Sequence, residues 1–229
     1  MIDAVLFDLD GTLADTAPDM ARTVNLMRTN RGLAPVPAEV VRPHVSQGAR
    51  GMILSAFGIG TDDPEFAAMR AEFLDLYAGN LCIDTQLFPG MEQLLAGLES
   101  EAIAWGVVTN KFERFAKPLI AALGLGTRAA VVIGGDTCAR AKPFPDPLLF
   151  AASSMGVTPA LTLYVGDDER DVQAARAAGM PVVVAGYGYL GGTAPATWNA
   201  DAILDSPAHL DAWIRDAGGR RLAGAGASR

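Results

Sequence analysis

Hydrophobic positions follow two different rhythms along this chain, and the change between them separates one region from the rest. Residues 4–7 form a short, continuous apolar run of strand-favouring residues that ends at an Asp-Leu-Asp-Gly turn. From about residue 16 to residue 88, apolar residues instead recur at three- and four-residue spacing, the period of a helix. Beyond Pro89-Gly90, short apolar runs alternate with helical stretches.

This alternation predicts a parallel sheet that is covered by helices on both faces. The expected strands are residues 4–7, 103–108, 130–133, 161–165, 181–185 and 202–204, and the expected helices between them are 91–101, 114–123, 147–155, 168–178 and 208–215. We therefore expect an α/β protein in which residues 1–14 and 89–216 form a Rossmann-like core. A helical cap subdomain, residues 15–88, is inserted after the first strand. Residues 217–229 contain no acid and no aromatic residue, and they predict a flexible C-terminal tail.

The composition narrows the class of protein further. Half of the 229 residues are hydrophobic (50%), which excludes disorder as the main state and suffices for a core with an inserted subdomain. A net charge of −8 argues against nucleic acid as a partner. Two cysteines, Cys82 and Cys138, fit neither a metal motif nor a disulfide framework. Because the N-terminus lacks a signal-peptide pattern and no apolar run reaches about 20 residues, we expect a cytoplasmic protein without membrane contacts.

Acidic residues gather at the ends of two of the expected strands. Asp8 and Asp10 end the first strand, and since alternate strand positions share a side, both project from the sheet edge where doubly wound sheets bind ligands. Residues 167–171 follow a later strand and contain four acids, an excess of charge that suggests a compensating cation. Oxygen-rich sites of this kind suit Mg²⁺. Helix capping is the alternative interpretation for Asp168 and Glu169.

Polar residues near two further strand ends predict a place for a phosphate group. Thr109 and Asn110 end the strand 103–108 just before a helix, where a hydroxyl and backbone N–H groups can hold a phosphate oxygen. Lys142 precedes a proline-rich stretch, residues 143–147, which presents its ammonium group from a stiff loop. Taken alone, the first pair is also an ordinary loop pair, and Lys142 is also an ordinary surface lysine.

Taken together and in this order, the motifs resemble the haloacid dehalogenase superfamily of phosphatases. The matching residues are Asp8-Leu9-Asp10-Gly11-Thr12, Thr109-Asn110, Lys142-Pro143, and Gly166-Asp167 with Asp171 four residues on. Within the superfamily, Thr109-Asn110-Lys111 and Lys142-Pro143-x-Pro145-x-Pro147 resemble the phosphoglycolate phosphatase group. Residues 44–50 and 105–111 also resemble the N-acetylmuramic acid 6-phosphate phosphatases.

The resemblance implies hydrolysis through an aspartyl-phosphate intermediate. In that mechanism Asp8 is the nucleophile, Asp10 is the general acid and then the general base, and Lys142 neutralises negative charge. The resemblance also implies Mg²⁺ as the cofactor, held by the Asp8 carboxylate, the backbone carbonyl of Asp10 and Asp167. Asp171 orients Lys142 or a metal-bound water. The substrate-binding residues that the resemblance implies are Thr12, Thr109 and Asn110.

The inserted helical segment is expected to close over the site and to select the substrate. Arg50 follows a stretch of small residues at an expected junction between loop and helix, and it is a candidate for binding a substrate carboxylate. A solvated helix arginine is the alternative. We expect a small phosphate ester as the partner, with phosphoglycolate first and N-acetylmuramic acid 6-phosphate or another sugar phosphate as alternatives. The chain is expected to act as a monomer or a homodimer.

Two interpretations outside enzymes are less well supported. A phospho-receiver module also has acids, a threonine and a lysine at a sheet edge, but receivers are shorter, lack a helical insert and carry the phosphorylated aspartate on a middle strand. A binding-only relative of the phosphatases is disfavoured because no motif residue is missing.

A dehalogenase is an alternative among enzymes. Dehalogenases do not need the second aspartate, so Asp10 favours a phosphatase.

One further motif does not fit this picture. Residues 186–191 spell Gly-Tyr-Gly-Tyr-Leu-Gly, which matches the glycine spacing of a dinucleotide site. Such a site needs a helix that begins there, and the residues that follow do not predict one. We therefore expect a flexible loop near the rim of the active site, in which Tyr187 and Tyr189 either line the pocket or cover the sheet edge.

Overall fold

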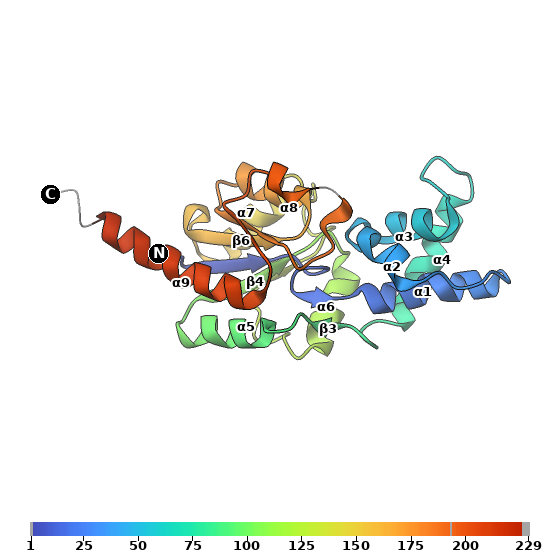
Figure 1. Ribbon diagram of the computed structural model, residues 1–229, viewed down its shortest axis with the longest axis horizontal. Helices are drawn as coiled ribbons and strands as arrows, with labels where there is room; N and C mark the ends of the chain where they lie inside the picture. The colour runs from blue at the N-terminus through green and yellow to red at the C-terminus, as the bar shows by residue number, and fades with distance from the viewer. Residues whose placement is uncertain (1, 193, 226–229) are drawn as a thin grey trace.

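Six parallel strands form the central sheet of the computed structural model, which describes residues 2–192 and 194–225 (Figure 1). In spatial order they are β5 (Val132–Ile133), β4 (Ala104–Val108), β1 (Ala4–Phe7), β6 (Thr162–Gly166), β7 (Val182–Ala185) and β8 (Ala202–Leu204). Because all pairings are parallel, the strands end at the same edge of the sheet. Each expected strand is present to within two residues at either end, and the predicted α/β class is confirmed.

Helices cover both faces of this sheet (Figure 1). Alternate residues of each strand point to opposite faces, so each strand packs against helices on both sides. Val5 and Phe7 of β1 pack into one apolar cluster, whereas Leu6 packs into another on the opposite face. The first layer consists of α5 (Met91–Ser100), α6 (Glu113–Ala122) and α9 (Pro207–Ala225), and the second of α7 (Asp146–Met155) and α8 (Glu169–Ala177). Short 3-10 helices lie at η2 (Pro159–Leu161), η3 (Leu190–Gly192) and η4 (Pro195–Thr197). Burial on both faces explains why the strands appear in the sequence as continuous apolar runs.

The last helix, α9, extends farther than the expected residues 208–215. Its backbone is helical from Pro207 to Ala225, so it enters the segment that was expected to be a flexible tail. Residues 226–229 of that segment lie outside the described residues, and flexibility from residue 217 onward stays a prediction. Within the described part of the chain, no helix is both long and apolar enough to cross a membrane.

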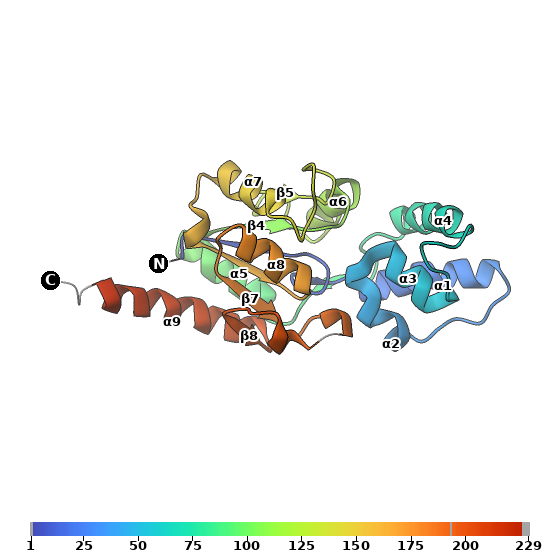
Figure 2. The same ribbon diagram turned by 90° about the horizontal axis from the view of Figure 1, so that it is seen from above.

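A second group of helices forms the cap, at the opposite end of the molecule from α9 (Figures 1 and 2). Its elements are α1 (Ala17–Asn30), α2 (Ala38–Val41), the 3-10 helix η1 (Arg42–Gln47), α3 (Gly48–Phe57) and α4 (Phe66–Gly79). These helices bury an apolar cluster of their own, which includes Met27, Met52 and Phe73. Tyr189 of the core also belongs to it. Phe115 of α6 belongs to it as well, so the cluster extends across the junction between cap and core, and the bounds 15–88 of the cap subdomain stay a prediction.

Two very short strands connect the cap to the core. β2 (Ala14–Asp15) pairs antiparallel with β3 (Gln86–Leu87), with Ala14 opposite Leu87. The segment that leaves the core and the segment that returns to it therefore lie side by side. Strands of two residues leave no hydrophobic periodicity, which is why the sequence pattern does not predict them.

Candidate active site

A cavity of about 240 Å³ lies where the cap meets the carboxyl edge of the sheet. Asp8 and Thr109 directly follow the last residues of the neighbouring strands β1 and β4, so the parallel register brings them to the same place. Seven of the predicted site residues line this cavity: Asp8, Asp10, Arg50, Thr109, Asn110, Lys142 and Asp171. The other two, Thr12 and Asp167, are fully buried behind its wall.

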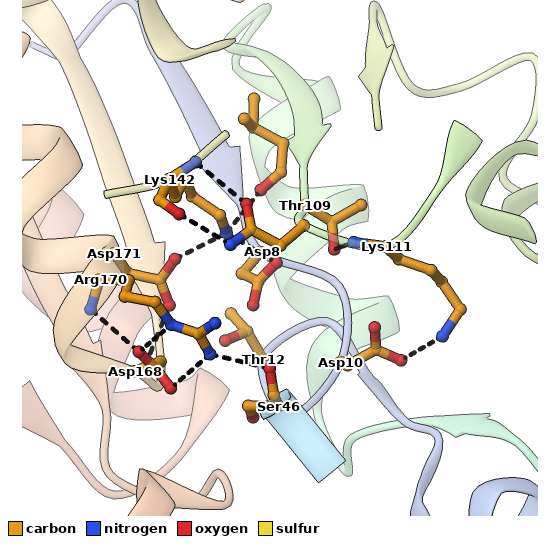
Figure 3. A network of polar contacts seen from close by, with 12 residues as sticks. Asp8, Asp10, Thr12, Ser46, Thr109, Lys111, Lys142, Asp168, Arg170 and Asp171 are labelled. Atoms are coloured by element: carbon orange, nitrogen blue, oxygen red, sulfur yellow. Dashed lines mark hydrogen bonds and ion pairs between the residues drawn. The ribbon is translucent and has the colours of Figure 1, made fainter. Parts of the chain in front are cut away.

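Lys142 lies at the centre of the polar network (Figure 3). Its Nζ is 2.9 Å from Asp8 Oδ1 and donates to Asp171 Oδ1 at 2.6 Å and to the Tyr164 hydroxyl at 2.8 Å. The carbonyl of Val108 lies 3.0 Å away. Burial alone would lower the pKa of Lys142, but the two carboxylates raise it above its ordinary value. The ammonium group is therefore charged and held in place by four neighbours, which a surface lysine would not be.

Three buried carboxylates lie close together at this site, and two of them, Asp8 and Asp171, contact Lys142. Oxygens of Asp8, Asp167 and Asp171 all lie within 4.8 Å of one another. Burial raises the pKa of Asp8 to about 6, opposed by Lys142 and assisted by Asp171. Burial and the Asp8 carboxylate likewise raise the pKa of Asp167 well above its usual range. Lys142 alone therefore does not favour the ionised forms of all three carboxyl groups.

These donors fit a hard divalent cation. Asp8 Oδ1 is buried and, among the described residues, no donor forms a well-aligned hydrogen bond with it. Carboxylate oxygens with unused lone pairs are the ligands that Mg²⁺ prefers, and a second cation would offset the remaining charge. Both oxygens of Asp171 are already engaged, Oδ1 by Lys142 and Oδ2 by the backbone N–H of Asp168. Asp167 also accepts hydrogen bonds at both oxygens, but only from neutral donors, whereas Asp171 Oδ1 pairs with the Lys142 cation at 2.6 Å. Asp8, Asp167 and Asp171 all stay candidate metal ligands.

Asp167 is fixed by three donors from separate parts of the chain. The Thr12 hydroxyl donates to Oδ1 at 3.1 Å, and the Ser46 hydroxyl and the Tyr189 backbone N–H donate to Oδ2 at 3.2 and 2.9 Å. The Thr12 side chain is buried, does not line the cavity and donates to Asp167, and the substrate-binding role expected for it stays a prediction. Ser46 belongs to the cap, so Asp167 contacts both parts of the molecule.

The glycine-rich segment 186–191 packs tightly against this carboxylate. A Cβ at Gly188 would lie 2.4 Å from the Cβ of Asp167, and one at Gly11 would lie 2.2 Å from its Oδ2. Gly11 also has a φ of +87°, which side chains rarely adopt. The expected position of residues 186–191 near the active site is confirmed, whereas the flexibility expected for this loop stays a prediction. Tyr187 and Tyr189 do not line the cavity either.

Asp10 has a cation of its own. Its Oδ1 accepts from Lys111 Nζ at 2.8 Å and from the Thr16 hydroxyl at 2.6 Å. Burial would lower the pKa of Lys111, but Asp10 and Tyr77 raise it above its ordinary value, and its ammonium lies 4.7 Å from the centre of the Tyr77 ring. The Asp10 side chain is thus separate from the acidic triad (Figure 3). Sequence reasoning quoted Lys111 in a motif but gave it no role, although its place after Thr109-Asn110 was a usable signal.

Thr109 and Asn110 have different roles in the described structure. The Asn110 side chain donates to the Lys142 carbonyl at 2.9 Å and accepts from the Lys142 backbone N–H at 3.1 Å. It therefore fixes the loop that carries the lysine. The Thr109 hydroxyl accepts from the Lys111 backbone N–H at 3.1 Å, and its proton has no acceptor among the described residues. That proton is available to a phosphate oxygen.

Two cations from the cap and an apolar wall from both cap and core complete the cavity. Arg50 on α3 and Arg70 on α4 both line it and are exposed. Neither forms an ion pair within the described part of the chain, although Arg70 lies 5.6 Å from the centre of the Phe112 ring. The apolar wall consists of Met20, Phe73, Leu74, Tyr77, Phe112 and Phe115. Sequence reasoning missed Arg70, because nothing in its helix distinguishes it from a solvent-facing arginine.

Asp168 and Arg170 link the core to the cap loop. Asp168 is the N-cap of α8, where it forms a capping box with Asp171, so the capping interpretation of this acid is confirmed. Its carboxylate pairs with Arg170 at 2.8 Å. Arg170 also donates to the backbone carbonyl of Ser46 at 2.8 Å. No pattern in the sequence pointed to this contact, since it joins the start of α8 to η1, 124 residues apart.

The sequence and the fold of this chain are similar to those of known hydrolases. Residues 5–185 match the family described as haloacid dehalogenase-like hydrolase. The chain is 50% identical over 208 residues to a phosphoglycolate phosphatase of Xanthomonas campestris, covering 90% of this chain and 94% of the relative. It is 44% identical over 210 residues to an N-acetylmuramic acid 6-phosphate phosphatase of Pseudomonas aeruginosa, covering 91% and 93%. The crystal structure of a predicted phosphoglycolate phosphatase from Haemophilus somnus matches with a TM-score of 0.80 at 29% identity, covering 91% and 96%.

Proposed function

The chain belongs to the haloacid dehalogenase-like hydrolase family and is a phosphatase of that family, and from this premise we propose that it hydrolyses the phosphate monoester of a small carboxylic acid. Phosphoglycolate is the leading substrate, because the relative at 50% identity acts on it by name. One observation carries the proposal. The cavity presents the Asp8 carboxylate beside the charged Lys142 on one side and the Asp10–Lys111 pair on the other.

Asp8 is the proposed nucleophile. A carboxylate oxygen of Asp8 forms a bond to phosphorus as the bond from phosphorus to the substrate oxygen breaks, which leaves an aspartyl-phosphate and an alkoxide. Asp10 gives its proton to that alkoxide, so an alcohol departs. Asp10, now ionised, takes a proton from the water that attacks the aspartyl-phosphate. Inorganic phosphate is released and Asp8 is restored.

Lys142 and Thr109 bind the transferring group. The Lys142 ammonium lies next to Asp8 and offsets the charge that gathers when a phosphate dianion approaches this carboxylate. The Thr109 hydroxyl and the backbone N–H of Asn110 are placed to donate to phosphate oxygens at the end of β4. Asp171 positions Lys142 and does not itself contact the substrate in this scheme.

We assign the cofactor role to Mg²⁺, held by the carboxylates of Asp8 and Asp167 and by the backbone carbonyl of Asp10. When bound, the ion supplies electrostatic screening between the nucleophile and the phosphate group. The buried acidic triad supports this assignment, because Lys142 alone does not favour the ionised forms of all three carboxyl groups, whereas a divalent cation would. Removal of divalent metal is therefore expected to abolish hydrolysis.

The apolar wall of the cavity favours a second candidate substrate, N-acetylmuramic acid 6-phosphate. This molecule combines a phosphate monoester with a carboxylate and a sugar ring, whereas phosphoglycolate has only two carbons. The aromatic residues Phe73, Tyr77, Phe112 and Phe115 extend along the cavity, where a sugar ring with an apolar substituent has surface to bury. Arg50 and Arg70 suit the carboxylate of either substrate.

A comparison of kcat/KM across matched substrates tests both candidates. Each carboxylate is paired with its neutral counterpart: phosphoglycolate with 2-hydroxyethyl phosphate, and N-acetylmuramic acid 6-phosphate with N-acetylglucosamine 6-phosphate. We expect the carboxylate to be preferred within each pair, and Arg50→Ala to reduce that preference by roughly 10–100-fold. Equal rates within both pairs would contradict the carboxylate assignment, and no Mg²⁺-dependent hydrolysis of any of the four would contradict the proposed function. A cytoplasmic location and a monomeric or dimeric state stay predictions.

A further inference from the structure

The glycine-rich loop after β7, residues 186–191, connects the Asp167 carboxylate to residues 15–17, the hinge between core and cap. Tyr189 alone makes this connection. The backbone N–H of Tyr189 donates to Asp167 Oδ2 at 2.9 Å. Its side-chain hydroxyl reaches the start of α1, where it accepts from the backbone N–H groups of Thr16 at 2.9 Å and Ala17 at 3.0 Å. The same hydroxyl donates to Asp15 Oδ1 at 2.8 Å. Its two lone pairs and its proton are therefore all used.

These contacts cap the first helix of the cap from outside the cap itself. The first backbone N–H groups of a helix have no partner within it. Thr16 is the N-cap residue of α1, but its side chain makes no capping bond. Its hydroxyl instead donates to Asp10 at 2.6 Å. The Ala17 N–H also donates to Asp15 Oδ1 at a longer 3.3 Å, so Tyr189, a residue of the core, provides the shorter contact to Ala17 and the side-chain contact to the Thr16 N–H.

The same loop also contacts the segment that returns from the cap to the core. The Tyr187 ring lies 5.0 Å from the ring of Phe88, which follows β3, and its hydroxyl donates to the carbonyl of Thr12 at 3.1 Å. On the cap side, the Arg42 guanidinium lies 5.0 Å from the centre of the Tyr189 ring. The loop thus contacts both linkers that join the cap to the core.

There is little free space around the Tyr189 side chain. The residue is 6% exposed, and a Cβ at Gly11 would come within 2.7 Å of its ring. A tyrosine has two rotatable side-chain bonds, and here the ring packs while both ends form hydrogen bonds. A change in how Asp167 is held will therefore be transmitted to Thr16 and Ala17 rather than absorbed by the ring.

We propose that Tyr189 is a positioning residue that couples divalent-metal binding at Asp167 to the cap hinge at residues 15–17. The inference rests on the metal site of the proposed function, and it is independent of which phosphate ester is the substrate. Metal binding at Asp167 and the contacts of Tyr189 with Thr16 and Ala17 stabilise each other through this one side chain. Coupling of this kind is reciprocal, so a weakened hinge contact also weakens metal binding.

Amide hydrogen exchange in the full chain, with MgCl₂ as the only added ligand, tests the coupling. In the wild type we expect Mg²⁺ to slow exchange of the Thr16 and Ala17 amides. Tyr189→Phe keeps the ring and the backbone N–H but removes the hydroxyl, and we expect it to lose this response at saturating Mg²⁺. Its dissociation constant for Mg²⁺, measured by calorimetric titration, should rise about fivefold or more.

Tyr187→Phe is the matched control, since it removes another hydroxyl from the same loop without a contact to α1. We expect it to keep the Mg²⁺ response of both amides. Unchanged exchange at Val5 and Phe7 shows that each variant retains the core. Persistence of the response in Tyr189→Phe, or Mg²⁺ binding by the wild type without any change at Thr16 and Ala17, would overturn the coupling alone. Failure of the wild type to bind Mg²⁺ in the titration would overturn the proposed metal site and this coupling with it.

Discussion

Two buried lysine–aspartate pairs lie on either side of the same cavity, and different parts of the molecule hold them in place (Figure 3). The described contacts of Lys142 are all to the core, at the ends of β1 and β4, on β6 and on α8. The Lys111–Asp10 pair instead contacts Thr16 in the linker and Tyr77 on α4 of the cap. In the proposed mechanism, the core thus fixes the groups that receive the phosphoryl group, whereas cap and linker residues contact the Lys111–Asp10 pair that handles the proton.

The largest effect is expected when the core pair loses its nucleophile. Asp8→Asn removes the carboxylate that attacks phosphorus, and kcat should fall on the order of 10⁴-fold or more. The fold should survive, because one of three closely spaced buried carboxylates is replaced by a neutral group. Steady-state rates and thermal unfolding midpoints measure the two effects. Near-normal turnover by this variant would refute the proposed mechanism.

Loss of the core cation comes next in size. Lys142→Met leaves buried carboxylates without their ammonium partner, and breaking such a pair costs about 3–5 kcal/mol of the free energy of unfolding. Rates should fall roughly 10²–10³-fold for alkyl and aryl phosphates alike, because charge on the phosphoryl group must be offset with either leaving group. Denaturant titration of the metal-free protein gives the stability. Unchanged stability would show that Lys142 does not offset the Asp8 and Asp171 charges.

The rate loss caused by replacing Lys111 should depend on the leaving group of the substrate, whereas the rate loss caused by replacing Lys142 should not. Lys111→Met removes the cation that holds Asp10, and we expect kcat for an alkyl phosphate to fall about 10²-fold. An aryl phosphate should be much less affected, since a phenolate departs without needing a proton. The ratio of the two rates, measured in wild type and in both lysine variants, is the readout. Equal losses for both esters would mean that Lys111 does not act through proton transfer.

The parts of this site that the sequence predicted are those set by strand register. Asp8, Thr109 and Asp167 each follow a strand, and parallel strands end at a common edge, so their proximity follows from the apolar runs alone. Lys142 could be placed only by resemblance to a family, because the loop that carries it has no regular period. The structure then shows the ammonium group buried between Asp8 and Asp171.

The contacts between core and cap were beyond prediction for a physical reason. Tyr189 bonds to Thr16 across 173 positions and Ser46 to Asp167 across 121, and each contact joins two irregular segments. No hydrophobic repeat relates such loops, and the two-residue strands that align the linkers are too short to leave one. The bond from Thr12 to Asp167 was not predicted for the same reason, since the two residues lie 155 positions apart.

The smallest predicted effect separates the stability of the cap from its role at the active site. Arg31 at the end of α1 forms a bidentate pair with Glu72 on α4, with distances of 2.9 and 2.5 Å, and the pair is partly exposed. Hydrogen bonding to Arg31 holds the pKa of Glu72 below its ordinary value of 4.5, so the ionised form is favoured in the folded protein. The stabilisation is therefore present above that value and is lost as pH falls through the lowered pKa. Glu72→Gln should lower the free energy of unfolding by about 0.2–1 kcal/mol at pH 7 and by less at pH 3, with the alkyl-to-aryl rate ratio unchanged. A changed rate ratio would show that the packing of the cap helices, and not only the hinge contacts, sets the position of Asp10.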